Sequence, residues 1–367
     1  VKELVENAID AGSTKIDVDI RDGGKSSIVV MDNGHGMGRE DLVAALDRHA
    51  TSKLPGDDLL NIAHMGFRGE ALPSIGAVAR LKIQTREKDG DAWEILAEAG
   101  KKHDPIPSGH PEGTQVEIKD LFYATPARLK FLKSERAEFM AVKDTLVRLS
   151  MGFPHISFRL THDGKQSFHY PAVLDSQSRL SKILGREFGD NCMQIDAQRE
   201  DIKLSGYASL PTLHRGTSQH QYLFINGRSV HDKLLKGCSR GAYSEVLARD
   251  RHPIVCLFLD VPNEDVDVNV HPAKAEVRFR EPAMVRGLIV TALKHALHEG
   301  GYKSSSSVSN QALGALTPAN NAGPSLPHHR GSSPSVPYQY AQNSRQYGNL
   351  AEATDQAYQP QMNWAQD

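Results

Sequence analysis

The sequence predicts an α+β protein in which two domains are followed by a disordered segment. A chain of 367 residues that is 39% hydrophobic and 24% charged has a globular composition and is long enough for two domains. Helical and strand periodicities alternate up to about residue 300. They change character at HYPAVLDSQSR, where a strand pattern ends and a helix pattern starts. We therefore expect domains at residues 1–174 and 175–302.

The composition changes after Gly300 and limits the kinds of site and partner to expect. KSSSSVSNQALGALTPANNAGPSLPHHRGSSPSVPYQYAQNSRQ has almost no apolar periodicity, so we interpret residues 303–367 as a disordered linker. Three cysteines without a C-x-x-C pair, and 17 histidines without H-E-x-x-H or paired spacing, predict neither disulfides nor a zinc site. No apolar run approaches a membrane span, so no membrane partner is expected. The net charge of -2 means that any contact with nucleic acid needs a local basic patch.

The opening stretch VKELVENAIDAGST predicts an amphipathic helix. Glu3, Asn7 and Asp10 share its polar face, which makes Glu3 and Asn7 neighbours. A carboxylate can orient and deprotonate a water, and an amide oxygen beside it can ligate Mg²⁺. For the helix taken alone, a solvated polar face is the alternative. The apolar face comprises Val1, Leu4, Val5, Ala8 and Gly12.

The next stretch, KIDVDIRDGGKSSIVVMDNGHGMG, predicts a β-hairpin that delivers a carboxylate to a glycine-rich turn. Apolar residues alternate in the first strand, Gly-Gly forms the turn, and the second strand ends at Asp32. An ionised Asp32 can accept a hydrogen bond from an exocyclic amine such as that of adenine, whereas guanine offers a carbonyl there. Gly34, Gly36 and Gly38 would let a flat ring lie against bare backbone. An ordinary Asp-Asn-Gly loop is the alternative.

A second glycine-rich segment, GFRGEALPSIGAV, leads into another predicted helix. Glycines before a helix N-terminus leave backbone N–H groups to hold phosphate oxygens, and the helix dipole favours the anion. The spacing matches neither the Walker A loop nor the dinucleotide-binding G-x-G-x-x-G pattern. We therefore expect a phosphate site of another type.

The order of these motifs resembles that of the ATPase family shared by DNA gyrase, heat-shock chaperones, sensor histidine kinases and mismatch-repair proteins. Within it, ELVENAIDAG, HATSK, GFRGEAL, LFYATPAR and VDVNVHPAKAEVRF resemble the MutL mismatch-repair proteins, from Val1 to about Gly300. The resemblance implies an α/β sandwich ATPase domain with helices on one face of a mixed sheet. A smaller βαβ domain similar to part of a ribosomal protein is expected to follow it.

The resemblance also implies a role for each matching residue. Glu3 would be the general base for the water that attacks the γ-phosphate, Asn7 the Mg²⁺ ligand and Asp32 the adenine reader. Glu6 is expected to be a solvated helix residue. Lys274 would reach the γ-phosphate from the second domain, and an exposed loop lysine is the alternative. The nucleotide-binding set further comprises Gly34, Gly36, Thr51, Ser52, Lys53, Gly66, Phe67, Arg68, Gly69 and Thr114.

Two basic stretches are candidates for DNA contacts, and ordinary charged helix faces are the alternative. The resemblance implies that the second stretch lines the central groove of a homodimer. There it would bind the phosphates of double- and single-stranded DNA without reading sequence, and Arg240 is the first candidate for such a contact. The first stretch comprises Arg128, Lys130, Lys133, Arg136, Lys143 and Arg148, and the second comprises Arg228, Lys233, Lys236, Arg240, Arg249 and Arg251.

The function implied by the resemblance is that of a bacterial, cytoplasmic and nucleoid-associated mediator of DNA mismatch repair. Mg²⁺-dependent ATP binding and hydrolysis would close a homodimer and couple mismatch recognition by MutS to a downstream nuclease and helicase. Two alternatives stay open: a topoisomerase-type ATPase subunit, whose cleavage tyrosine no part of the chain resembles, and a non-catalytic ATP-binding DNA scaffold. Family members close a segment preceding Val1 over the nucleotide, so full ATPase activity is expected to need it. No acidic, His-containing motif follows the linker, so nuclease activity is not supported.

Overall fold

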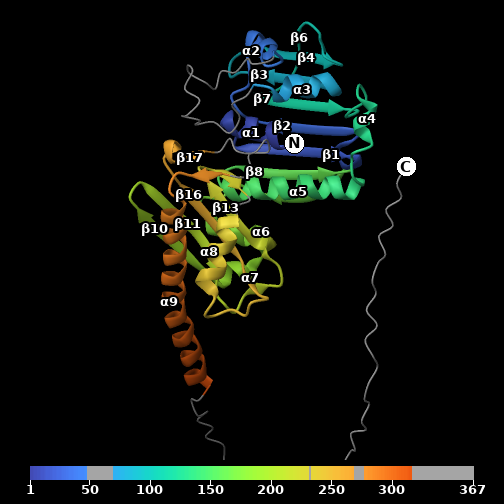
Figure 1. The fold of residues 1–367 in the computed structure, drawn as a ribbon. Helices are drawn as coiled ribbons and strands as arrows, with labels where there is room; N and C mark the ends of the chain where they lie inside the picture. Colours follow the sequence, from blue (N-terminus) through green and yellow to red (C-terminus); the bar gives the residue numbers. More distant parts are fainter. Residues whose placement is uncertain (48–68, 231–232, 268–276, 316–367) are drawn as a thin grey trace, which may run out of the picture. The chain divides into compact units, whose positions relative to one another are not determined.

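The computed structural model describes residues 1–47, 69–230, 233–267 and 277–315 (Figure 1). Nine strands form one mixed sheet in the order β5-β4-β3-β7-β2-β1-β8-β9, with β6 beside β4. β1 and β8 run parallel, and the other neighbours in this sheet are antiparallel. The strands are β1 (Lys15–Arg21), β2 (Ser27–Asp32), β3 (Arg80–Arg86), β4 (Ala92–Glu98), β5 (Lys101–Lys102), β6 (Ile106–Pro107), β7 (Gly113–Lys119), β8 (Ser157–His162) and β9 (Lys165–Tyr170).

Helices cover one face of this sheet, as predicted. Ile16, Val18 and Ile20 of β1 are buried with the apolar residues of the helices, because alternate side chains of a strand point to the same face. The opposite face is polar and carries ion pairs such as Lys82 with Glu117, 3.4 Å apart. The elements that accompany the sheet are α1 (Lys2–Asp10), η1 (Asp22–Gly24), α2 (Arg39–Ala44), α3 (Ala71–Val78), α4 (Pro126–Leu129) and α5 (Glu135–Gly152).

The second domain is built on a five-stranded sheet in the order β10-β11-β16-β13-β14. β13 and β16 pair in parallel and α8 lies in the connection between them, which is the expected βαβ unit. Its elements are α6 (Ser176–Leu184), α7 (Arg186–Asp190), β10 (Cys192–Arg199), β11 (Ile202–Ser209), β12 (His214–Arg215), η2 (Ser218–His220), β13 (Gln221–Ile225), β14 (Arg228–Val230), α8 (Lys233–Tyr243), β15 (His252–Pro253), β16 (Val255–Asp260), η3 (Asn263–Asp265), β17 (Val266–Asp267), β18 (Arg278–Phe279) and α9 (Pro282–Ala315).

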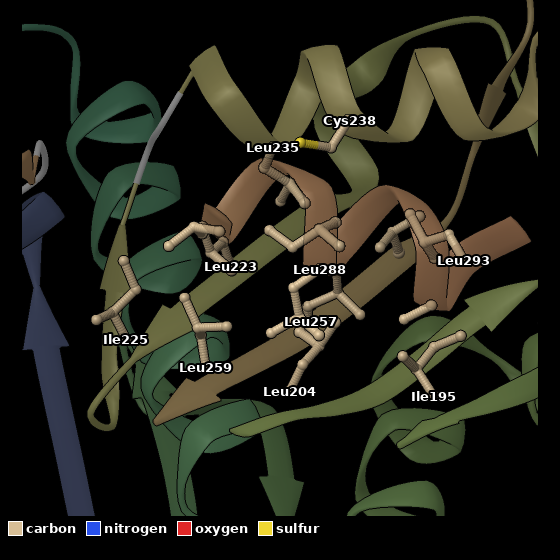
Figure 2. Close-up of a cluster of buried hydrophobic side chains, with 14 of the residues drawn as sticks. Ile195, Leu204, Leu223, Ile225, Leu235, Cys238, Leu257, Leu259, Leu288 and Leu293 are labelled. Atoms are coloured by element: carbon tan, nitrogen blue, oxygen red, sulfur yellow. The ribbon is translucent and has the colours of Figure 1, made fainter. Parts of the chain in front are cut away.

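Both faces of the second sheet are covered by helices. Leu223 and Leu257 pack with Leu235 of α8 and Leu288 of α9 (Figure 2). Cys256, which neighbours Leu257 in β16, points the other way and packs with residues of α6 and α7. Because both faces are buried, the strands QYLFI and VCLFLD are almost continuously apolar instead of alternating.

A buried arginine joins the two domains. The Arg179 side chain of α6 is 1% exposed, and this burial lowers the pKa of its guanidinium to about 10. The guanidinium satisfies backbone groups where α5 leads into β8 and where β9 ends. It donates to the carbonyl oxygens of Ser150 (3.1 Å), Pro154 (2.8 Å), Ile156 (2.7 Å) and Pro171 (2.9 Å).

One residue of α1 departs from the prediction. Leu4, Val5 and Ala8 are buried as expected, but Glu6, predicted to be solvated, is only 3% exposed. Its carboxylate lies 3.6 Å from Lys2 Nζ, and the charge of Glu6 also acts on Arg228 of β14. A helical period does not predict charge interactions with distant segments such as this one.

The last helix passes the domain boundary predicted at residue 302. α9 runs from Pro282 to Ala315 and so covers the first part of the segment that composition assigned to the linker. The first proline after Gly300 is Pro318, and a helix can continue until such a residue stops it. The rest of that segment, residues 316–367, lies outside the described residues. None of the helices in the described ranges has the length and apolar character needed to cross a membrane.

Candidate nucleotide-binding site

Asp32 stands at the end of β2, where the strand meets the glycine-rich turn. Its Oδ1 accepts hydrogen bonds from the hydroxyl of Ser13 (3.0 Å) and the backbone N–H of Gly34 (2.8 Å). Ser13 follows α1, so these bonds attach the C-terminal end of α1 to β2. Burial raises the pKa of Asp32, against the lowering effect of its hydrogen bonds. An ionised carboxylate has about four lone-pair sites, so Asp32 keeps acceptor capacity for a further donor.

The glycines of the turn are required by close approaches of the backbone. A Cβ at Gly34 would lie 2.7 Å from the Ala11 Cβ, and one at Gly36 would lie 2.0 Å from the Arg86 carbonyl oxygen. Gly36 also has a φ of +68°, which favours glycine. These glycines therefore press the turn against the ends of α1 and β3. Contact with a flat ring, the reason given by the sequence, stays a prediction.

Buried hydroxyl groups lie beneath the turn. Thr114, a predicted site residue on β7, is the cross-strand partner of Asp32, and its Oγ1 lies 3.0 Å from that of Thr85. Thr85 also accepts the N–H of Met37 (2.9 Å), which ties the turn to β3. Thr85 was not predicted from the sequence, although it continues the buried alternation of Leu81 and Ile83 along β3.

Helix α1 carries the candidate base Glu3 and the candidate Mg²⁺ ligand Asn7. Glu3 is exposed and Asn7 half-buried. At 1.5 Å per residue, Glu3, Asn7 and Ala11 succeed one another at intervals of about 6 Å along the axis. The Ala11 carbonyl accepts the N–H of His35 (3.0 Å), so the turn of Asp32 lies at the far end of α1 from Glu3. About 12 Å of helix therefore separates the turn of Asp32, the predicted adenine reader, from Glu3, the predicted base.

The predicted lid is described only at its last residue. Gly69 precedes α3 and has a φ of +60°, a conformation that glycine adopts without strain. The remaining predicted residues lie outside the described residues, and their roles stay predictions. They are Thr51, Ser52, Lys53, Gly66, Phe67, Arg68 and Lys274.

The predicted DNA-contacting residues fall into different environments. Lys236 and Arg240 are exposed on α8, as a phosphate contact requires. Arg228 is 7% exposed on β14, and its burial lowers the pKa of its guanidinium while Glu6, foremost among the acids of α1, raises it. The burial of Arg228 and its charge interaction with α1 do not favour a surface contact with DNA phosphates, and its DNA-binding role stays a prediction. The side chain of Lys233 lies outside the described part of the chain.

Two family models match the chain in succession. Residues 1–104 match the histidine kinase-, DNA gyrase B- and HSP90-like ATPases, and residues 180–298 match the C-terminal domain of DNA mismatch repair proteins. The chain is 56% identical, over 334 residues and 89% of its length, to the DNA mismatch repair protein MutL of Rhodospirillum rubrum. The chain belongs to the MutL family.

Further members and solved structures agree with this assignment. MutL of Paramagnetospirillum magneticum is 53% identical over 322 residues, which are 86% of this chain. The chain covers 53% of each of these two proteins, about half the length of the curated MutL relatives it matches. The Aquifex aeolicus MutL ATPase domain complexed with ADP is 26% identical with a TM-score of 0.56, covering 78% of this chain and 94% of that one. The N-terminal domain of a DNA repair protein has a TM-score of 0.69 at 24% identity, covers 81% and 93% of the two chains, and supports the fold.

Proposed function

We propose that this chain binds and hydrolyses ATP as the nucleotide-responsive part of a mismatch-repair mediator. The observation that carries the proposal is the half-buried Asp32 carboxylate, whose Oδ1 accepts hydrogen bonds from Ser13 and Gly34 near the end of α1. Such a carboxylate suits the exocyclic amine of adenine. A solved relative of similar fold, the Aquifex aeolicus MutL ATPase domain, is a complex with ADP.

The residues along α1 suit the phosphate end of the same nucleotide. With adenine at Asp32, the phosphates extend toward Asn7, whose amide oxygen would hold Mg²⁺ with them. The ion, when bound, supplies positive charge that offsets the charge developing on the phosphates. Glu3 is exposed one turn further along and has the carboxylate needed to take a proton from the attacking water. Gly69, the other predicted lid residues and Lys274 would also contact the phosphates.

The DNA-facing part of the proposal rests on α8. Lys236 and Arg240 are exposed there, and Lys233 begins the same helix. In a homodimer closed by ATP, these residues would bind DNA phosphates without sequence preference, on double or single strands. The closed form would then couple MutS to a nuclease and a helicase in the bacterial cytoplasm.

The two alternative functions, a topoisomerase-type subunit and a non-catalytic ATP-binding scaffold, are separated from the mediator by different observations. The match of residues 180–298 to DNA mismatch repair proteins favours the mediator over a topoisomerase-type subunit. A scaffold that binds ATP without turnover has the same Asp32 environment, so the two are separated by activity. Hydrolysis by the wild-type protein excludes the scaffold, and tight ATP binding without hydrolysis favours it.

The test replaces Glu3 by Gln in the full-length protein, with Asp10→Asn on the same helix as the matched control. Calorimetry should find ATP affinity within about threefold of the wild type, because other groups hold the ground state. Phosphate release should fall by about 100-fold or more, since general-base catalysis contributes on that order. The control should retain turnover. Equal loss of binding and turnover in Glu3→Gln would make Glu3 a structural residue.

A further inference from the structure

A histidine and two carboxylates meet at a second place on the first domain. Glu135 lies in the first turn of α5, His162 ends β8, and Asp163 begins the turn to β9. His162 Nε2 lies 3.1 Å from Asp163 Oδ2 and 3.5 Å from Glu135 Oε1. One ligand atom from each of the three residues lies within 4.8 Å of the other two.

This place is separate from the nucleotide-binding site. β1 pairs Ile16 with Asp32 at one end and Ile20 with His162 at the other. Four residues of strand amount to about 13 Å, so the cluster and Asp32 lie toward opposite ends of β1. Nothing proposed for ATP binding or hydrolysis uses the cluster.

The surroundings hold each group in place. Asp163 has a φ of +48°, as an Asp-Gly hairpin turn requires, and its Oδ1 accepts the N–H of Asp22 (3.1 Å). Its other oxygen, Oδ2, is the one that approaches His162. The His162 ring stacks on Phe139, with centroids 3.9 Å apart and planes 13° from parallel, which fixes the direction of Nε2. The N-terminal end of α5 stabilises the negative charge of Glu135.

The two distances from His162 Nε2 to the carboxylate oxygens are close to the edges of a tetrahedral metal site. Zn²⁺ binds imidazole nitrogen and carboxylate oxygen at about 2.0 to 2.2 Å, so tetrahedral ligand atoms lie about 3.3 to 3.5 Å apart. The two nitrogen-to-oxygen separations, 3.1 and 3.5 Å, bracket that range. We propose that Glu135, His162 and Asp163 bind a Zn²⁺ ion, with water as the fourth ligand.

The proposed ion would fasten three elements that are distant in sequence. Its ligands come from α5, β8 and the β8–β9 turn, and Asp163 is further bonded to η1 through Asp22. Its role is therefore structural. The sequence predicts no zinc site because none of its histidines has ligands at short, regular spacing, whereas Glu135 and His162 belong to separate elements. Without a metal, the same three side chains form a histidine ion pair, and the experiment separates the two states.

The binding test titrates ZnCl₂ into the metal-free wild-type chain and its variants at neutral pH, followed by calorimetry. Asp163→Asn is the first variant, because Asn tolerates the positive φ and can still accept the Asp22 N–H. Glu135→Gln is the second. The control is His169→Gln on β9, whose Nε2 lies 3.3 Å from Ser157 Oγ instead of a carboxylate of the cluster. We expect Zn²⁺ affinity to fall at least tenfold in both ligand variants and to stay unchanged in the control.

Thermal unfolding gives a second readout that adventitious binding to the other histidines does not reproduce. At ten times the Kd, Zn²⁺ should raise the Tm of the wild type by about 2 to 4 °C and leave that of Asp163→Asn unchanged. Co²⁺ in the same place should give the visible spectrum of a tetrahedral complex. Equal Zn²⁺ affinity in the wild type and Asp163→Asn, an equal Tm shift in the two, or an equal loss in His169→Gln would each overturn the site.

Discussion

Replacement of Asp32 by Asn should change which base the pocket prefers, because the surroundings dictate how the new amide is oriented. The backbone N–H of Gly34 can only donate, so it requires an acceptor where Oδ1 of Asp32 now lies. The amide oxygen of Asn takes that place. Its NH₂ group then occupies the position of Oδ2 and faces the site of the adenine amine, so two donors oppose each other.

The magnitude follows from the bond that is lost. A hydrogen bond to a charged group contributes about 1.5 to 3 kcal/mol, so ATP affinity should fall by about 10- to 150-fold. GTP presents a carbonyl where ATP presents an amine, so GTP affinity should be unchanged or improved, and the ATP-to-GTP preference should narrow at least as much as the ATP affinity falls. The assay is calorimetric titration with ATP, ADP and GTP.

Asp17→Asn is the matched control. Asp17 is also a strand carboxylate of the first domain, but it pairs with Lys15 (3.2 Å) and Arg159 on the polar face of the sheet. Its loss should leave nucleotide binding unchanged. ATP affinity and base preference in Asp32→Asn equal to those of the wild type would refute the base-reading role.

Because the pKa of Asp32 is raised, both the ATP affinity and the folding stability should depend on pH. Only the ionised carboxylate accepts the amine in full, so ATP affinity should weaken as the pH falls through the raised pKa, and Asp32→Asn should lack this dependence. For stability the sign is opposite. The folded state binds the Asp32 proton more tightly than the unfolded state, so wild-type stability falls as the pH rises from the ordinary Asp value through the raised pKa. The ligand-free Asn variant should gain stability relative to the wild type over that window.

Three further substitutions have defined outcomes. Arg179→Leu leaves four backbone carbonyls without their buried donor and should lower the free energy of unfolding by about 3 kcal/mol or more in denaturant titrations. A loss below about 1 kcal/mol would contradict the role of Arg179 in joining the two domains. Arg228→Met should lower the free energy of unfolding by about 3 kcal/mol, because it removes the positive charge that interacts with buried Glu6. Adding Glu6→Gln to this variant should recover part of the lost stability. Additive losses in the double variant would rule out coupling between the two residues. Arg240→Glu should weaken binding to all DNA sequences and reduce the salt dependence by about one phosphate contact per subunit, with ATP affinity unchanged, and an unaltered salt slope would remove Arg240 from the DNA surface.

Much of the first domain could be predicted because its signals are local. The alternation of Ile16, Val18 and Ile20 identified the buried face of β1, and the end of the next strand located Asp32. Both depend on a strand of period two and on turn residues close by in the sequence. The order of the motifs then indicated the family, which the matched relatives confirmed.

What could not be predicted depends on contacts between distant segments. Glu6 belongs to the polar pattern of α1, yet it is buried, and its charge acts on Arg228 of β14, more than two hundred residues later. Thr85 looks like any strand threonine until β7 places Thr114 beside it. The Glu135, His162 and Asp163 cluster has no spacing signature, because its geometry arises from the packing of α5 against the end of β8.

The most direct measurement is an experimental structure of the protein with a non-hydrolysable ATP analogue and Mg²⁺. It should place the exocyclic amine of adenine within about 2.7 to 3.2 Å of an Asp32 carboxylate oxygen. The γ-phosphate should lie at the Glu3 end of α1, and Asn7 should coordinate the metal. An analogue bound with its base away from Asp32, or with its phosphates at the Ser13 end of α1, would contradict the account.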